Sequence, residues 1–192
     1  ATFMGFAPYN NPEVAVSVFE RKLLEKPDAV IVNHVSNVFG YQMPVERISD
    51  LCAEQGIPFI LDASQSAGTL NINMEKLKAA FIAMPGHKGL YGPQGTGLLL
   101  CGAKPRPLLQ GGSGSNSTLP LMPDYLPDML EAGTHNMPGI AGLSAGIDFV
   151  LKNRERILAH EKHLISVISE ELRGIQGLKV FASDHVYSQV GV

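Results

Sequence analysis

The sequence lacks tryptophan, holds only two cysteines and has no long hydrophobic run in its 192 residues. No apolar segment approaches the roughly 20 residues that a membrane-spanning helix needs, so we predict no association with a membrane. The first residues, ATFMGFAPYN, lack the charged start and apolar centre of a signal peptide. Cys52 and Cys101 form neither a metal-binding spacing nor a disulfide framework, and we expect both to be buried small apolar side chains.

The sequence also has no large excess of charge of one sign. It contains 15 Lys and Arg and 18 Asp and Glu, which gives a net charge of −3. The basic residues are scattered along the chain, so the sequence offers no basic face for nucleic acid. Hydrophobic residues make up 45% of the chain, which is enough for one core of ordinary size. The composition predicts a soluble cytoplasmic α/β protein and assigns it no particular function.

The first half of the sequence alternates apolar runs with helical patterns. Four short apolar runs predict buried strands, at residues 28–35, 57–63, 80–84 and 95–101. Amphipathic patterns at residues 44–56 and 74–80 predict helices between them. This alternation is typical of a three-layer α/β fold, a mostly parallel sheet with helices on both faces. Only about ten loop residues separate the last two strands, so this pair is predicted to be antiparallel.

The second half of the chain has a different character. Residues 104–127 are rich in Gly, Ser and Pro and predict a long loop, a kind of segment that is often functional. The GGSGSNS run in this loop fits neither common phosphate-loop pattern, and we expect it near the mouth of a substrate site. Residues 139–175 predict one long helix or two helices that meet near Asn153. The tail predicts a strand, a turn and the first residues of another strand, and the abrupt ends suggest a fragment.

Polar side chains lie at the ends of three predicted strands. They are His34, Asn37, Asp62, Gln65, His87 and Lys88. Because ligands of open α/β sheets bind at the carboxyl ends of the strands, we expect the functional site at this edge of the sheet. A carboxylate, amides and an amine would meet there.

Asp62 and Lys88 allow two interpretations. A carboxylate at the end of an apolar strand is partly desolvated, which disfavours its charge unless a cation pairs with it. The first interpretation is a structural ion pair between Asp62 and Lys88. The second is that both side chains contact one aromatic cofactor, an arrangement that belongs to a catalytic site.

Pyridoxal 5'-phosphate (PLP) fits the second interpretation. PLP needs a lysine that forms a Schiff base with its aldehyde and an acid beside its pyridine nitrogen. Lys88 and Asp62 would supply these groups, and Ala63 is small enough for the ring to lie flat above it. Gln65 and Asn37 would donate to the phenolic oxygen of the ring, although both amides could equally cap the strand ends.

The histidines divide into one cofactor candidate and several structural ones. His87, with backbone N–H groups of the glycine-rich run around it, could hold the phosphate of PLP. His34 is interpreted as a hydrogen-bonded histidine at a strand end. His160 and His163 lie three residues apart on a predicted helix without a third ligand nearby, so we expect surface groups and no metal site.

Four motifs carry a resemblance to a known family. They are NHVSNVFG at 33–40, ILDASQSAG at 60–68, PGHKGLYGPQGTG at 85–97 and EAGTHNMPGIAGL at 131–143. In order and spacing they resemble the class V PLP-dependent aminotransferases, in particular the cysteine desulfurase and selenocysteine lyase group, over roughly residues 26–175. The resemblance implies the PLP-dependent transferase type I fold, here as an incomplete large domain.

The resemblance also implies roles for individual residues. It makes Lys88 the Schiff base lysine and places Asp62 at the pyridine nitrogen, Gln65 and Asn37 near the ring oxygen, and His87 at the phosphate. It implies that Thr134 reaches the phosphate of the partner subunit's cofactor, in a homodimer with shared active sites. The implied reaction is that of a cysteine desulfurase, which takes sulfur from L-cysteine, a small amino acid, and passes it to an acceptor protein.

The sequence departs from the family pattern at several points. Pro85 stands where many relatives have a serine, so Ser64 or backbone groups would have to replace a phosphate contact. The family's phosphate-binding turn and ring-stacking histidine would precede residue 1. The persulfide-forming cysteine and the carboxylate-binding arginine would follow Val192. The resemblance implies that residues 1–182 form the central part of the large domain and that residues 183–192 begin a small domain.

Two alternatives to a desulfurase stay open at this stage. The first is another reaction on the same scaffold, namely a class V aminotransferase or a selenocysteine lyase, because all of these share their cofactor contacts. The second is an inactive folded fragment without catalysis. Uptake of PLP, seen as visible colour, would separate the second alternative from the enzymes.

Overall fold

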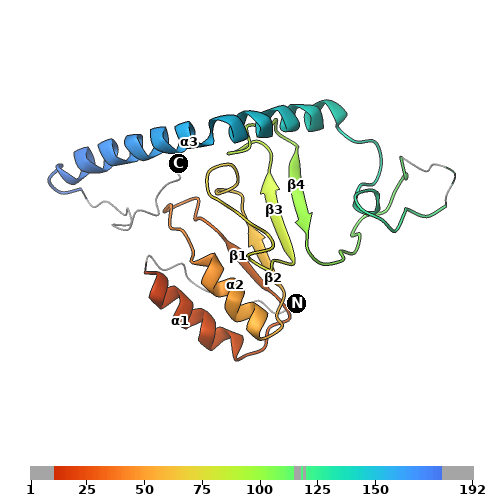
Figure 1. Ribbon diagram of the computed structural model, residues 1–192, viewed down its shortest axis with the longest axis horizontal. Coiled ribbons are helices and arrows are strands. Elements are labelled where there is room, and N and C mark those ends of the chain that lie inside the picture. Colours follow the sequence, from red (N-terminus) through yellow and green to blue (C-terminus); the bar gives the residue numbers. More distant parts are fainter. Residues whose placement is uncertain (1–10, 115–117, 119, 179–192) are drawn as a thin grey trace.

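The computed structural model describes residues 11–114, 118 and 120–178, and these form an α/β unit built on one mixed sheet (Figure 1). The strands are β1 (Val30–Asn33), β2 (Phe59–Asp62), β3 (Phe81–Pro85) and β4 (Gly97–Cys101), in that order across the sheet. The pairs β1–β2 and β2–β3 are parallel, and β3–β4 is antiparallel. The predicted strands, the mostly parallel sheet and its antiparallel last pair are confirmed.

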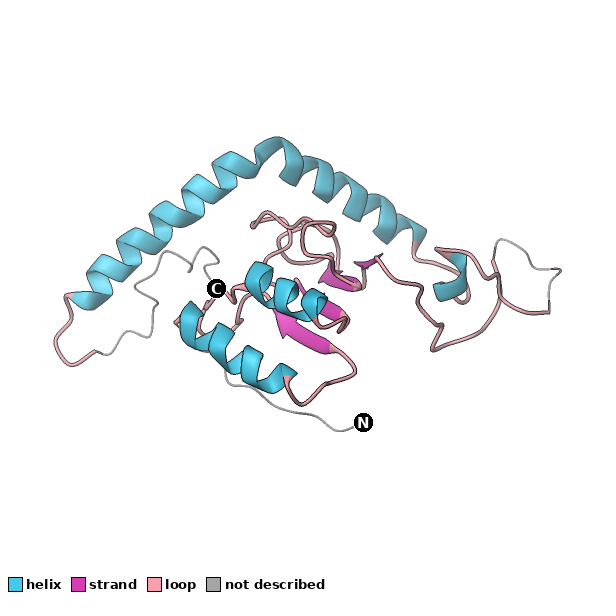
Figure 2. Cartoon of the chain, turned by 60° about the horizontal axis from the view of Figure 1, so that its bottom comes forward, coloured by secondary structure: helices cyan, strands magenta, loops and turns pink. Residues whose placement is uncertain are grey.

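Two helices pack on one face of the sheet. They are α1 (Pro12–Leu23) and α2 (Val45–Glu54), which lie side by side in Figure 2. The sheet side of this layer is apolar, with Val32, Leu61 and Ile82 buried in neighbouring strands. Each such side chain contributes about 1.5–3 kcal/mol when it is fully buried. On the opposite face, Ile31 of the edge strand β1 is 68% exposed, whereas Ile60 and Phe81 of the inner strands are partly buried.

The helix α1 was not predicted, although its start carries a clear signal. The side chain of Asn11 accepts hydrogen bonds from the backbone N–H groups of Glu13 and Val14, and Pro12 occupies the first turn. An asparagine before a proline at a helix start satisfies the first free N–H groups of the helix. The apolar residues Val16, Phe19 and Leu23 then follow at helical spacing and are buried.

The structure corrects one sequence prediction about helices and decides between two alternatives for another. Residues 74–78 form turns instead of the helix expected at 74–80. Asn73 accepts there from the backbone N–H of Lys76, and Lys78 has a φ of +49°, which ends any helical continuation. Residues Met137–Arg173 form the single helix α3, so no break separates two helices near Asn153.

The remaining predictions concern the cysteines, the long loop and the tail. Cys52 is buried, and burial raises the pKa of its thiol to about 11, whereas Cys101 is only partly buried. The described residues of 104–127 contain no helix or strand, and a short 3-10 helix, η1 (Asp128–Leu130), follows them. The predicted strands of the tail and the predicted domain boundary after residue 182 lie outside the described residues.

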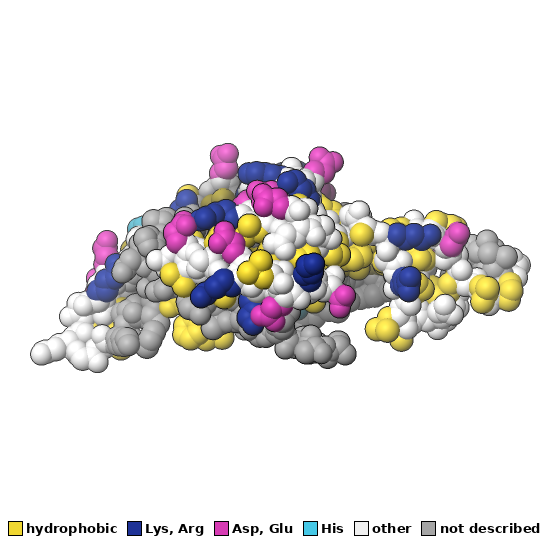
Figure 3. Space-filling view, turned by 90° about the horizontal axis from the view of Figure 1, so that it is seen from below, with side chains coloured by type: hydrophobic (Ala, Val, Ile, Leu, Met, Phe, Trp, Pro, Cys, Tyr) yellow, Lys and Arg dark blue, Asp and Glu magenta, His cyan; other side chains and the backbone are white. Residues whose placement is uncertain are grey.

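Charges of both signs are mixed over the surface. On the face shown in Figure 3, Lys and Arg side chains lie among Asp and Glu side chains rather than in a patch of one sign. In the described residues, no helix is long and apolar enough to cross a membrane. No group of three or more His, Cys, Asp or Glu side chains within those residues could hold a metal ion.

Candidate active site

The carboxyl ends of the three parallel strands bring Asn33, Asp62 and Ala83 into register. The side chain of Asp62 is held there by two neutral donors. Nδ2 of Asn33 donates to Oδ2 of Asp62 over 2.8 Å, and the backbone N–H of Ser64 donates to Oδ1 over 2.9 Å. Asn33 was missed in the sequence, although it ends its apolar strand in the same way that Asp62 ends the next one.

The turn after Asp62 is compact and anchored to the next strand. The backbone N–H of Ala63 donates to the carbonyl oxygen of Ala83 in β3, and the N–H groups of Ser66 and Ala67 both donate to the carbonyl of Ala63. Ala63 is completely buried, and the side chain of Gln65 is partly exposed. The turn therefore holds its shape through its backbone and leaves Gln65 partly accessible.

His34, the residue after β1, contacts the same turn. Its Nδ1 lies 2.9 Å from Oγ of Ser66, and both side chains are buried. Burial lowers the pKa of His34, while the charge of Glu46 acts in the opposite direction. The imidazole is thus neutral at pH 7, and its Nε2 has no hydrogen-bond partner among the described residues. The sequence predicted that His34 is fully hydrogen-bonded. This is correct for Nδ1 and wrong for Nε2.

Acidification is expected to weaken the fold through His34. Its pKa in the folded protein lies below the ordinary value of 6.5, so between these two values the unfolded chain binds a proton that the folded chain does not. Stability is then full above about pH 6.5 and falls below it, by at most about 1.4 kcal/mol per pH unit for one group. Urea unfolding from pH 8 to pH 5 should show a steeper loss for the wild type than for His34→Gln. Equal slopes would contradict this role.

Lys88 lies on a closed loop that follows β3. The backbone N–H of Gly92 donates to the carbonyl of Gly86 over 2.7 Å, and the N–H of Tyr91 donates to the carbonyl of Lys88 over 2.9 Å. Tyr91 has a φ of +56°, a conformation that residues other than glycine rarely adopt. The side chains of His87 and Lys88 are exposed at this loop. The loop therefore presents both side chains from a constrained backbone.

The Lys88 loop packs directly on the turn that follows Asp62. A Cβ atom added to Gly68 would overlap the carbonyl oxygen of Gly89, and one added to Gly89 would overlap the carbonyl oxygen of Ala67. The two backbones touch without intervening side chains. Lys88 is the residue before Gly89, so this contact fixes the origin of the lysine side chain relative to the segment that begins at Asp62.

Helix α3 supports the Lys88 loop from the other side (Figure 1). Gly146 lies so close to the loop that an added Cβ would be 2.5 Å from the carbonyl oxygen of Leu90. The rings of Tyr91 and Phe149 also contact each other, with centroids 5.5 Å apart. The loop is thus held between the turn of β2 and the first half of α3.

The structure excludes the interpretation of Asp62 and Lys88 as a structural ion pair. No ion pair joins these two residues, both of which lie in the described range 11–114. The carboxylate instead has neutral partners, and the ammonium group of Lys88 lies on an exposed side chain. Both charged groups therefore remain available to a ligand.

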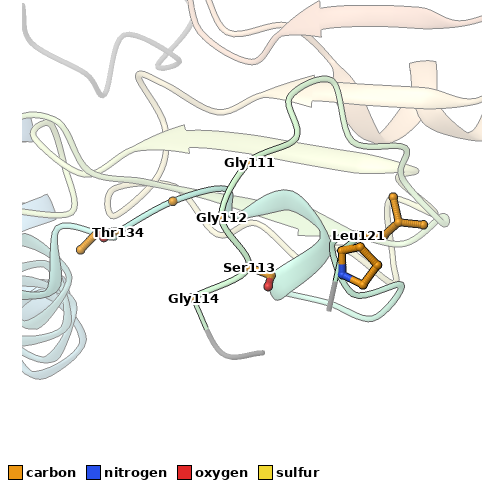
Figure 4. A pocket seen from close by; sticks show the side chains of 8 residues that line it. Gly111, Gly112, Ser113, Gly114, Leu121 and Thr134 are labelled. Carbon is orange, nitrogen blue, oxygen red and sulfur yellow. The ribbon is translucent and has the colours of Figure 1, made fainter. Parts of the chain in front are cut away.

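Asn37 and Thr134 are not joined to Asp62 or Lys88 by any hydrogen bond that the structure describes. Asn37 is exposed in a turn whose N–H groups at Val38 and Phe39 donate to Oγ of Ser36. Thr134 is exposed and lines a separate cavity of about 430 Å³ (Figure 4). The other residues around this cavity are Gly111, Gly112, Ser113, Gly114, Pro120, Leu121 and Gly133.

Residues 6–191 match the sequence model of the family described as aminotransferase class-V. The chain belongs to this family. A "Probable cysteine desulfurase" of Pyrococcus abyssi is 35% identical over 158 residues, which cover 79% of this chain and 39% of that protein. Another "Probable cysteine desulfurase", from Xylella fastidiosa, is 36% identical over 79% of this chain and 38% of its own length. This class V chain thus spans about two fifths of these relatives.

Solved structures agree with the class V assignment. The apo structure of a cysteine desulfurase from Thermococcus onnurineus has 33% sequence identity and a TM-score of 0.70, covering 88% of this chain and 45% of that one. The cysteine desulfurase CsdA of Escherichia coli has a TM-score of 0.77 at 23% identity, which supports the fold alone. The type I fold and the resemblance to the cysteine desulfurase group are confirmed.

Proposed function

We propose that this class V chain carries the PLP-binding centre of a cysteine desulfurase, which removes sulfur from L-cysteine. The names of the relatives support the reaction. The observation that carries the proposal is the backbone contact at Gly68 and Gly89, because it joins the lysine loop to the segment that begins at Asp62. One charged group of each sign is thereby offered from adjoining backbone segments, with no ion pair between them.

The residues of this chain fit PLP in their chemistry. Each oxygen of the Asp62 carboxylate takes one neutral donor, which leaves further lone pairs for the ring N–H of the cofactor. Ala63 is completely buried in the hydrophobic core, so no surface of its side chain is free for the ring that was predicted to lie above it. Lys88 is exposed and would bind the aldehyde of PLP through Nζ.

When bound, PLP supplies an electron sink for negative charge at the α-carbon of the substrate. Nζ of Lys88 would then take the α-proton, and Asp62 would keep the ring nitrogen protonated. The amides of Gln65 and Asn37 would donate to the phenolic oxygen of the ring. His87 would donate to the phosphate, and Thr134 would contact the phosphate held by a partner subunit.

The proposal extends to partners and location. A homodimer would bring Thr134 of one subunit to the cofactor of the other. A sulfur-acceptor protein would take the product, and the protein would act in the cytoplasm. Residues 1–182 would form the central part of the large domain, with a small domain beginning at residue 183.

Formation of alanine and sulfide from L-cysteine by the purified PLP-loaded protein tests this function, with an added thiol as the acceptor that takes up the sulfur and releases it as sulfide. We expect Asp62→Asn to lower the rate by at least about 100-fold, because the neutral amide cannot stabilise a protonated ring nitrogen. Asp50→Asn, at an exposed carboxylate paired with Lys78, is the matched control and should retain the rate. Formation of pyridoxamine phosphate and 3-mercaptopyruvate without sulfide would favour the transaminase alternative. A protein that never takes up PLP would contradict the proposal.

A further inference from the structure

We propose that Asn33 is a positioning residue that aims the carboxylate of Asp62 at the cofactor ring. This inference rests on the proposed PLP site and adds a residue that does not itself touch the cofactor. Asn33 is the one side chain in the described structure that donates a hydrogen bond to Asp62, from Nδ2 to Oδ2 over 2.8 Å.

The backbone fixes this pair of side chains. Asn33 and Asp62 are direct partners in the parallel register of β1 and β2, so their side chains leave the same face of the sheet. The backbone N–H of His34 donates to the carbonyl oxygen of Asp62 over 2.9 Å, immediately beside the pair. Asn33 therefore holds Asp62 from a strand whose own position is set by the sheet.

The two donors together set the orientation of the carboxylate. Asn33 holds Oδ2, and the backbone N–H of Ser64 holds Oδ1. With both oxygens held, the carboxylate cannot rotate freely about its last torsion. An ionised carboxylate has about four acceptor positions, so two remain for other donors.

An amide suits this role better than a cation. A lysine or arginine at position 33 would pair with Asp62 and compete with the ring nitrogen for the charge of the carboxylate. Asn33 orients the carboxylate and adds no charge. The side chain of Asn33 is exposed in the alternating pattern of β1. Water could therefore satisfy its amide group, and the hydrogen bond to Asp62 is not needed to compensate for burial. A role toward Asp62 explains it better than a role in folding.

The experiment compares Asn33→Leu, Asn33→Asp and the control Asn71→Leu, which makes the same exchange at an exposed asparagine. The measured quantities are the PLP dissociation constant and the visible spectrum, each referred to the wild type at the same pH. Loss of a hydrogen bond to a charged group should weaken PLP binding by about 10-fold or more in Asn33→Leu. The midpoint of urea unfolding should not change, and Asn71→Leu should bind PLP like the wild type.

Asn33→Asp makes the test independent of folding. It places a second carboxylate against Oδ2 of Asp62, and such a pair shares one proton at low pH and repels at high pH. We expect PLP binding close to the wild type at about pH 5.5 and about 10-fold weaker or more at pH 8. A merely structural role predicts no such recovery on acidification.

The outcomes separate this inference from the proposed function. Wild-type PLP affinity and spectrum in both Asn33 variants would overturn the role of Asn33. The proposed function would then stand as long as borohydride still fixes PLP to Lys88. A wild-type protein that does not bind PLP would overturn both proposals.

Discussion

Replacing Lys88 with alanine is expected to abolish covalent attachment of PLP and to remove the visible absorbance that attachment produces. Lys88 is the lysine on the loop packed against the turn after Asp62, and the described structure gives it no carboxylate partner. Without its amine, no bond to the aldehyde of PLP forms, and any remaining cofactor is held only by non-covalent contacts. Activity should fall by several orders of magnitude, because both attachment and proton transfer depend on this amine.

The measurement is borohydride reduction of the PLP-loaded protein followed by peptide mass spectrometry. In the wild type, the reduced cofactor should be found on the peptide that contains Lys88, and in Lys88→Ala on no peptide. Lys76→Ala is the matched control, because Lys76 is also exposed and lies in a turn between β2 and β3. Reductive labelling at the wild-type level in Lys88→Ala would rule out Lys88 as the cofactor lysine.

The edge of the sheet that bears the candidate site could be predicted because it depends on local rules. Apolar runs and turn residues located the strands, and their parallel order places all carboxyl ends at one edge. Asp62 and Lys88 could therefore be predicted as site residues from the sequence, without any distance between them. The short spacing before β4 was enough to predict an antiparallel pair, which the register of β3 and β4 confirms.

Features that depend on long-range contacts could not be predicted in this way. The bond from Asn33 to Asp62 requires the exact register of two strands whose partners are 29 residues apart. The helix predicted at 74–80 failed because Asn73 binds a backbone N–H inside the segment and favours a turn. The periodicity of residues 139–175 could not show whether the helix continues past Asn153, because that depends on backbone geometry and not on apolar spacing.

The contact between Gly68 and Gly89 is the least visible of these features and should have the largest effect on the fold. Gly68 has a φ of +88°, and a Cβ there would overlap the carbonyl oxygen of Gly89. Gly68→Ala combines backbone strain with a backbone clash that no side-chain rotation can relieve. We expect a loss of about 3 kcal/mol or more in the free energy of unfolding. For a chain of this size, that lowers Tm by roughly 6–12 °C.

Gly56→Ala is the control that shows the cost of backbone strain without the steric clash. Gly56 has a comparable φ of +67°, but a Cβ there would meet nothing within 4 Å. This control should lose only the about 1–2 kcal/mol of a left-handed conformation and keep PLP binding. In Gly68→Ala the Lys88 loop must move away from the turn after Asp62, so PLP binding should fall along with stability. Equal Tm values and equal PLP affinities in the two variants would mean that the backbones of the turn and the loop do not touch. The lysine and the aspartate would then lack the shared support on which the cofactor site depends.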